Sequence, residues 1–268
     1  MRKLRYRSIF ISDIHLGTKD AQAEYLLDFL RRTESQYLYL VGDIIDLWKL
    51  RSGWYWPQLK NNIVQLVMHK ASQGTAVIYV PGNHDELLRD YAGSFFNGIC
   101  IQGDAVHTTA AGKRLLLLHG DEFDSVVLNS KWLAHVGSWA YDWLLWVNRY
   151  FNVLRRRLGF PYWSLSEYLK HRVKNAVNHI SSFEEALARE AARRDVDGLV
   201  CGHIHKATIE NIHGVMYINC GDWVESCTAV VEDFSGELHI VRWVQDSATL
   251  LDHLQTDAIT TVADPCNS

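Results

Sequence analysis

The feature that most constrains the fold is a set of short polar clusters, each directly after a hydrophobic stretch that reads as a strand. The clusters are Asp13-Ile14-His15, Gly42-Asp43, Gly82-Asn83-His84-Asp85, His119-Gly120-Asp121 and Gly202-His203-Ile204-His205. From His15 to Asp43 the chain advances 28 residues, and from Asp43 to Asn83 it advances 40. Each interval has room for a helix and a returning strand, so the spacing predicts βαβ units.

The strands expected before the first three clusters are nearly continuous apolar runs over residues 8–11, 37–41 and 76–80. Such runs are typical of parallel strands that are covered on both faces. Open α/β sheets bind ligands at the carboxyl ends of their strands, where these clusters would lie. Further strands are expected later in the chain, at Gly198–Cys201, Thr208–Ile212, Val215–Asn219 and Glu237–Trp243.

The chain of 268 residues is long enough for one large α/β domain with an insertion. We expect the core to comprise residues 1–125 and 195–244, with a helical insertion over 126–194. Residues 245–268 show no sustained period and predict a flexible C-terminal tail. The apolar run that follows the basic start is too short for a signal peptide or a membrane span, which predicts a cytoplasmic protein.

The insertion is basic, whereas the chain as a whole has a formal charge of −4. Residues 131–180 contain eight Lys and Arg against two Asp and Glu. This asymmetry argues against a nucleic-acid-binding protein and predicts one basic surface on an otherwise acidic molecule.

Aromatic residues of the insertion recur at three- and four-residue spacing and predict one wide stripe on a helix. The stripe comprises Trp132, Val136, Trp139, Trp143, Trp146 and Tyr150, and Arg155-Arg156-Arg157 follows it. Three interpretations stay open. The stripe packs on the rest of the protein, it forms a dimer interface, or it rests at an anionic membrane surface while the insertion caps the site and binds acyl chains. The chain is accordingly expected to be a monomer or a homodimer.

The residue types in the clusters suit two divalent ions that share one ligand. Asp13, His15 and His205 are the expected ligands of one ion. Asn83, His119 and His203 are those of the other, and Asp43 is expected to bridge the two. Manganese is the expected metal, with iron or zinc as alternatives, because the set mixes oxygen and nitrogen ligands and contains no cysteine. A metal-bound hydroxide would then attack phosphorus in line.

Two residues beside the expected ligands are candidates for catalysis. His84 has no obvious place in either coordination shell, so we expect it to hold phosphate or to protonate the departing oxygen. Asp85 is expected either to orient His84 or to cap the following helix. Asp46 and Asp121 have similar alternatives, as partners of metal-bound histidines or as carboxylates of a loop or a first helical turn.

Over residues 8–243 these motifs resemble the calcineurin-like metallophosphoesterase superfamily. The resemblance implies a four-layer α/β/β/α sandwich, two metal ions and hydrolysis of phosphate esters or pyrophosphates. The size and the helical insertion are similar to those of UDP-2,3-diacylglucosamine pyrophosphatases of lipid A synthesis. Those enzymes split a nucleotide-linked glycolipid into UMP and an acylated sugar phosphate, which implies a peripheral enzyme at the inner membrane.

The resemblance also implies residues that bind substrate. Asn83, His84 and His203 are expected to do so at the centre, and Ser166, Lys170 and Lys174 in the insertion. The pyrophosphatases carry Arg where this chain has His84, so a paralogue that acts on a related diester is the second reading. Two further alternatives are an enzyme of the same fold that acts on a soluble nucleotide diester or a phosphoprotein, and a noncatalytic scaffold that binds a membrane or another protein.

Overall fold

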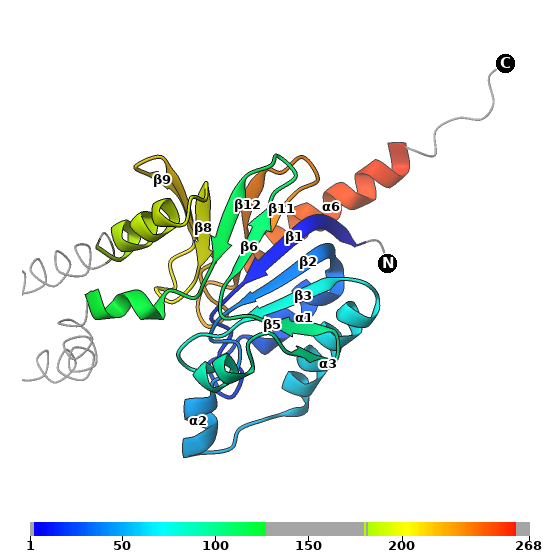
Figure 1. Ribbon diagram of the computed structural model, residues 1–268. Coiled ribbons are helices and arrows are strands. Elements are labelled where there is room, and N and C mark those ends of the chain that lie inside the picture. The colour runs from blue at the N-terminus through cyan, green and yellow to red at the C-terminus, as the bar shows by residue number, and fades with distance from the viewer. Residues whose placement is uncertain (1–2, 127–179, 181, 261–268) are drawn as a thin grey trace, which may run out of the picture. The chain divides into compact units, whose positions relative to one another are not determined.

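Figure 1 shows the computed structural model, which describes residues 3–126, 180 and 182–260. The chain divides into two compact units, Met1–Asp121 with Ala188–Ser268, and Glu122–Leu187. The first unit contains two β-sheets and helices, which is the mixed α/β fold that the sequence predicts. Most of the predicted helical cap lies outside the described residues, and residues 182–193 within it are helical.

Seven strands form the first sheet, in the order β12-β11-β1-β2-β3-β5-β4. Their bounds are β1 Leu4–Ile11, β2 Thr33–Val41, β3 Ala76–Val80, β4 Phe95–Phe96, β5 Ile99–Ile101, β11 Thr228–Glu232 and β12 Leu238–Arg242. Strands β1, β2, β3 and β5 run parallel. Helix α1 (Ala23–Arg32) connects β1 to β2, and α2 (Leu47–Ser52) and α3 (Gln58–Ser72) lie between β2 and β3. The predicted βαβ units are therefore confirmed.

The second sheet has five strands in the order β6-β7-β8-β10-β9. Their bounds are β6 Ala105–Thr108, β7 Arg114–Leu117, β8 Gly198–Cys201, β9 Thr208–Ile212 and β10 Val215–Asn219. Three of these strands, β8, β9 and β10, have the bounds that the sequence predicts. Since β7, β8 and β10 are parallel, their carboxyl ends meet at one edge of this sheet.

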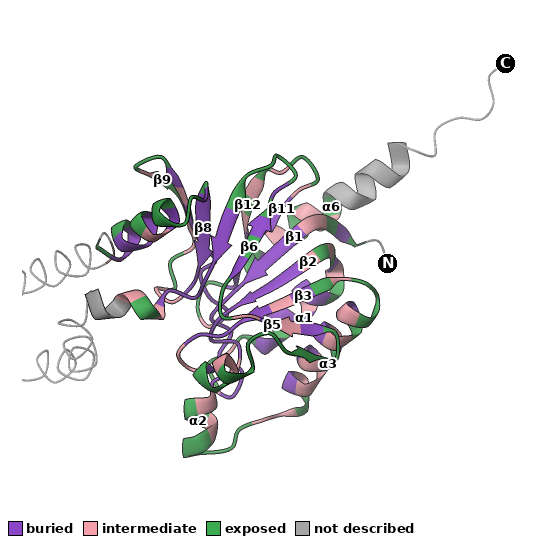
Figure 2. Cartoon of the chain, in the orientation of Figure 1, coloured by how far each residue is buried: buried purple, intermediate pink, exposed green. Residues whose placement is uncertain are grey.

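Hydrophobic side chains hold the layers of the first unit together. Helix α1 buries Ala23, Leu26, Leu27 and Leu30, which recur at helical spacing and pack in one cluster with side chains of the first sheet. A second cluster joins the two sheets and includes Phe10, Tyr39, Leu115 and Val200. Figure 2 shows the result, with buried strands in both sheets and exposed residues on the outer faces of α1 and α3.

Residues 243–260 correct one prediction. They form helix α6 (Trp243–Thr260) where the sequence predicts the end of a strand and then a flexible tail. Trp243 is 1% exposed, and its ring packs against Phe29 with centroids 5.2 Å apart. Leu250 and Leu251 also pack on the core, so tertiary contacts stabilise a helix whose own apolar pattern is weak. Two short 3-10 helices, η1 (Glu86–Tyr91) and η2 (Asp121–Val126), complete the described elements.

Candidate metal centre

Each predicted cluster follows a strand that pairs in parallel within one of the two sheets. Asp13 follows β1, Asp43 follows β2, Asn83 follows β3, His119 follows β7 and His203 follows β8. Backbone hydrogen bonds join neighbouring loops. The amide of Asp13 donates to the carbonyl of Gly42 over 3.0 Å, and that of Gly202 donates to the carbonyl of His119 over 3.2 Å. Parallel pairing thus gathers residues that are distant in sequence.

The backbone is strained at these loops. Nine of the described non-glycine residues have a positive φ, and five of the nine are expected metal ligands. The five are Asp13 (φ 50°), His15 (52°), Asp43 (54°), His203 (71°) and His205 (54°). Left-handed backbone costs of order 1 kcal/mol per non-glycine residue and concentrates at functional sites. The backbone conformation that orients these side chains therefore lowers the stability of the fold.

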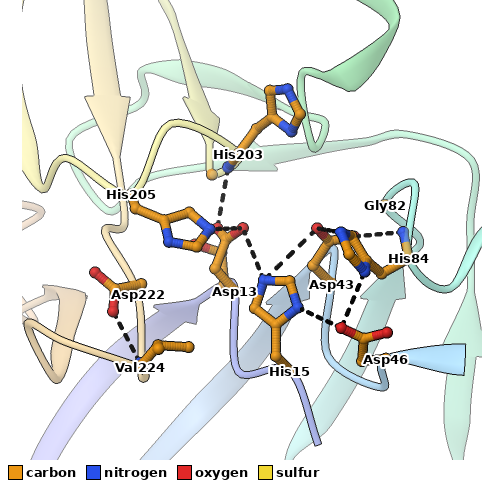
Figure 3. A network of polar contacts seen from close by, with 12 residues as sticks. Asp13, His15, Asp43, Asp46, Gly82, His84, His203, His205, Asp222 and Val224 are labelled. Atoms are coloured by element: carbon orange, nitrogen blue, oxygen red, sulfur yellow. Dashed lines mark hydrogen bonds and ion pairs between the residues drawn. The ribbon is translucent and has the colours of Figure 1, made fainter. Parts of the chain in front are cut away.

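One group of donor atoms forms around Asp13, which is fully buried. Single ligand atoms of Asp13, His15 and His205 all lie within 4.8 Å of one another. Nε2 of His205 is 3.1 Å from Oδ1 of Asp13, and Nε2 of His15 is 4.0 Å from the same oxygen. Figure 3 shows both imidazoles turned toward this carboxylate. These are the three residues expected to hold the first ion.

Asp43 lies between this group and His119. Its Oδ2 is 3.9 Å from Nε2 of His15 and 3.3 Å from Nε2 of His119. Asp13, Asp43 and His119 also have ligand atoms within 4.8 Å of one another. The ring of His203 is 5.2 Å from that of His119, centroid to centroid. The role of Asp43 as the bridging ligand stays a prediction, and its carboxylate has the position that this role needs.

Three buried atoms of the expected ligands have no hydrogen bond of good geometry to a described residue, although two of them lie within 3.3 Å of another expected ligand. They are Oδ1 of Asp13, Oδ1 of Asn83 and Nε2 of His119. Oδ1 of Asn83 has no hydrogen-bond partner at all within the described part of the chain, and a buried polar atom left so costs about 1–3 kcal/mol and is rare in native proteins. Divalent cations accept carboxylate, amide and imidazole donors, so this donor set fits metal ions. The observation is independent of the sequence motifs.

The charge balance of the centre supports the same fit. Burial disfavours protonated His119, but its contact with Asp43 and the charges of Asp13 and Asp43 outweigh burial and raise its pKa to about 10. Burial likewise disfavours charged Asp43, yet the imidazole of His119 lowers the pKa of Asp43 below its usual value. Two buried carboxylates thus require nearby positive charge, and bound metal ions supply it in exchange for protons.

Residues 6–207 match the family model described as "Calcineurin-like phosphoesterase". The chain belongs to this family. It is therefore a metal-dependent hydrolase. A UDP-2,3-diacylglucosamine hydrolase of Neisseria gonorrhoeae is 28% identical over 225 residues, which cover 81% of this chain and 89% of the relative. The enzyme of that name from Haemophilus influenzae is 25% identical over 88% of this chain and 98% of its own. A solved hypothetical protein from Pyrococcus horikoshii has a TM-score of 0.49 at 9% identity, covering 95% of this chain and 94% of its own.

The carboxylate of Asp46 serves two histidines of the phosphoesterase centre. Its Oδ2 is 3.2 Å from Nδ1 of His15 and 3.0 Å from Nδ1 of His84. Its Oδ1 accepts a hydrogen bond from the amide of Lys49 over 2.8 Å and so caps helix α2. Asp46 therefore contacts both histidines and caps α2, and the binding of metal by these histidines stays a prediction. The Trp48 ring lies against His84, with centroids 4.4 Å apart.

Asp85 lies against two of the loops that carry expected ligands, and its expected role toward His84 stays a prediction. Its carboxylate is fully buried and accepts hydrogen bonds from the amides of Gly82 (2.6 Å) and Ile44 (2.8 Å) and from the Tyr79 hydroxyl. It makes no side-chain hydrogen bond to cap η1. Asp85 therefore connects the loops after β2 and β3 and positions Asp43.

Sequence reasoning missed Asp222, which is 2% exposed and follows β10. Its Oδ1 accepts a hydrogen bond from the amide of Val224 over 2.8 Å (Figure 3). Burial lowers the pKa of His205, but the hydrogen bond and charge of Asp13, with the charge of Asp222, raise it overall. The sequence contains a pattern that could have identified Asp222, because Gly221-Asp222 follows a strand just as Gly42-Asp43 does.

The remaining predicted residues divide into two groups. Asp121 forms an ion pair with Arg89, whose guanidinium lies 2.7 Å from its carboxylate. Ser166, Lys170 and Lys174, with the aromatic stripe of the insertion, lie outside the described residues. Their assignment to substrate stays a prediction.

Proposed function

We propose that this phosphoesterase hydrolyses the pyrophosphate bond of a nucleotide-linked glycolipid, such as UDP-2,3-diacylglucosamine, and releases UMP and an acylated sugar 1-phosphate. The observation that carries the chemistry is the convergence of Asp13, Asp43 and His119, whose ligand atoms lie within 4.8 Å. The substrate is proposed from two relatives that share one printed name and that this chain matches over 89% and 98% of their lengths.

The metal ligands are proposed as two sets with a shared carboxylate. Asp13, His15 and His205 hold one ion, Asn83, His119 and His203 hold the other, and Asp43 contributes to both. When bound, the two ions supply Lewis acidity for the phosphoryl oxygens and lower the pKa of water, as in other two-metal hydrolases. Manganese is the proposed metal, with iron and zinc as the alternatives.

His84 is proposed to hold a phosphoryl oxygen and to donate a proton to the departing oxygen. Asp46 fixes its Nδ1, and Trp48 covers one face of the ring. Nε2 is left 3.9 Å from the carboxylate of Asp43, at the rim of the centre. The side chain is 23% exposed, so an incoming substrate can reach it. A general acid needs this combination of a fixed ring and access to the leaving group.

Exposed aromatic side chains on α2 and the loop that follows suit a lipid-linked substrate. Trp48 is 46% exposed and Trp54 is 78% exposed, on α2 and the loop that follows. We propose that the enzyme meets its substrate at an anionic membrane surface on the cytoplasmic side, with the basic insertion as a further contact. Among the described residues, no helix combines the length and the apolar character needed to cross a bilayer.

A second candidate is a phosphodiesterase that acts on a soluble nucleotide diester. The observation in its favour is His84 itself, which replaces the Arg expected from the lipid A enzymes. An imidazole is a smaller and weaker phosphate ligand than a guanidinium, which binds phosphate through two parallel hydrogen bonds. The lipid-linked substrate and the soluble diester therefore require a direct comparison.

The test is incubation of manganese-loaded protein with a UDP-linked diacyl amino sugar, with UMP release measured by mass spectrometry. Asp43→Ala is the control for the metal centre. The proposal predicts UMP release that disappears in Asp43→Ala. Hydrolysis of a generic chromogenic diester without UMP release, again abolished in Asp43→Ala, would reject the lipid substrate and favour the second candidate.

A further inference from the structure

A cavity of about 740 Å³ lies at the amino-terminal ends of β1 and β2, whereas the metal centre lies at the carboxyl ends of the same strands. Its volume is within the range of roughly 300–1,000 Å³ that is typical of ligand sites. The last turns of α1 and α3 complete its wall. The charged residues that line it are Lys3, Arg5, Arg31, Glu34 and Lys70, and Tyr6 and His69 are further titratable groups in its wall.

The cavity is strongly basic within an acidic protein. Four cationic side chains line it against the single carboxylate of Glu34, whereas the whole chain has a formal charge of −4. Lys3 donates a hydrogen bond to Glu34 over 2.9 Å. Within the described part of the chain, Arg5 and Arg31 form no ion pair, and both are exposed at the cavity wall.

Lys70 has an unusual environment for a lysine. It is 8% exposed and lies on the buried face of α3, in register with Ile63 and Val67. Its amino group donates to the backbone carbonyl of Thr33 over 2.6 Å, and a carbonyl carries no compensating charge. Burial, together with the charge of Lys3, lowers the pKa of Lys70 to about 8. A bound anion would stabilise this ammonium.

Structural roles explain only part of the cluster. A lysine at the end of a helix satisfies carbonyls and interacts favourably with the helix dipole, which accounts for Lys70. The Lys3–Glu34 pair is an ordinary surface ion pair of small energy. Neither role applies to Arg5, which lies on a strand, and neither explains why it shares a cavity with Arg31. Guanidinium groups are the side chains best suited to bind phosphate through two hydrogen bonds.

We propose that this cavity is a second, noncatalytic site that binds a phosphate group, carried either by a small soluble phosphate compound or by an anionic lipid headgroup. Arg5 and Arg31 contact the phosphate oxygens, and Lys3 and Lys70 supply further positive charge. The site is separate from the metal centre because the full length of β1 lies between them. This binding site does not depend on which substrate the metal centre hydrolyses.

The first test titrates metal-loaded protein with methylenediphosphonate, a non-hydrolysable diphosphate analogue, by calorimetry. The variants are Arg5→Glu/Arg31→Glu and the milder Arg5→Gln/Arg31→Gln, and the control is Lys113→Glu, an exposed cation on the turn between β6 and β7. In the wild type and in the control, we expect a second binding event in addition to binding at the metal ions. Its affinity falls about 100-fold in the charge-reversal variant, because two charge-assisted contacts are lost.

The second test distinguishes the two sources of phosphate. Co-sedimentation with phosphatidylglycerol vesicles, compared with phosphatidylcholine vesicles, is measured for the same proteins. Selective loss in the two Arg5/Arg31 variants identifies a lipid headgroup, whereas loss of diphosphonate binding alone identifies a soluble ligand. The proposal is overturned if either of these variants retains wild-type behaviour in both assays. Hydrolysis of a chromogenic diester stays at the wild-type rate in all variants, which confirms that the metal centre and the fold are intact.

Discussion

At the scale of single residues, the expected metal ligands are held in place by carboxylates that contact them or their loops. Asp46 contacts His15 and His84 and caps α2, while Asp85 holds the loops after β2 and β3. Partners of this kind fix the orientation and the basicity of metal-binding histidines. Both carboxylates are visible in the sequence, but the sequence cannot show which way the Asp85 side chain points.

Asp46→Asn should lower activity without unfolding the protein. The amide keeps the size of the side chain and its capacity to cap α2, but removes the charge that acts on His15 and His84. We expect kcat for a chromogenic diester to fall about 10- to 100-fold, with weaker manganese binding. Asp90→Asn is the matched control, because Asp90 is exposed on η1. Equal activity of the two variants would show that Asp46 serves only the helix.

Gly82→Ala should disrupt the centre by steric contact. A Cβ at this position would lie 2.4 Å from Oδ1 of Asp43 and 2.6 Å from Cδ2 of His119. Such overpacking typically costs about 1–3 kcal/mol, and both side chains have to shift. We expect a lower melting temperature and loss of diester hydrolysis. Gly53→Ala has open space around its Cβ and should behave as wild type. A fully active Gly82→Ala would mean that Asp43 and His119 need no fixed position.

At the scale of elements, a buried polar network joins the two sheets through residues other than the expected metal ligands. Glu232 on β11 is fully buried and accepts hydrogen bonds from Arg7 (2.8 Å) and Ser8 (2.5 Å) on β1. His107 on β6, in the second sheet, lies 2.8 Å from the same carboxylate. The network therefore fixes how the sheets pack, on which the position of the ligand loops depends.

Removing the negative charge of Glu232 should destabilise the whole domain. Glu232→Gln leaves the cation of Arg7 without its partner in a mostly buried site, which typically costs about 3 kcal/mol. Urea unfolding followed by circular dichroism measures the loss. Glu237→Gln, on the exposed turn between β11 and β12, should change the free energy of unfolding by less than about 0.5 kcal/mol. Similar unfolding midpoints for the two variants would rule out a structural role for the network.

The elements that the sequence predicted well are those with strong local patterns. The parallel strands are continuous apolar runs that end in polar clusters, and β8, β9 and β10 have the predicted bounds. Strand β11 was missed because its pairing partners, β1 and β12, decide it. Helix α6 was missed because packing of Trp243 and Leu250, rather than a clear helical period, stabilises it. The Glu232 network joins residues more than 100 positions apart, which no local pattern reveals.

At the scale of the whole molecule, metal binding should be coupled to stability. Among its described residues, the first unit buries Oδ1 of Asn83 without a hydrogen bond and brings the carboxylates of Asp13 and Asp43 close together. Ions that bind only the folded state stabilise it, by about 2.7 kcal/mol when the free ion is at 100 times its dissociation constant. We expect chelator treatment to lower the melting temperature by several degrees and manganese to restore it. No change on chelation would contradict a coupling between metal binding and folding.

Metal stoichiometry tests the central claim most directly. A further trio away from the strand ends, Asp233, Glu237 and His239, also has ligand atoms within 4.8 Å of one another, but its residues are partly or largely exposed. Manganese per chain is measured by mass spectrometry after equilibrium dialysis, with diester hydrolysis on the same samples. We predict two ions and full activity for the wild type and for Asp233→Asn, and at most one ion with no activity for Asp43→Asn. Two ions and full activity in Asp43→Asn would contradict a metal centre at the strand ends.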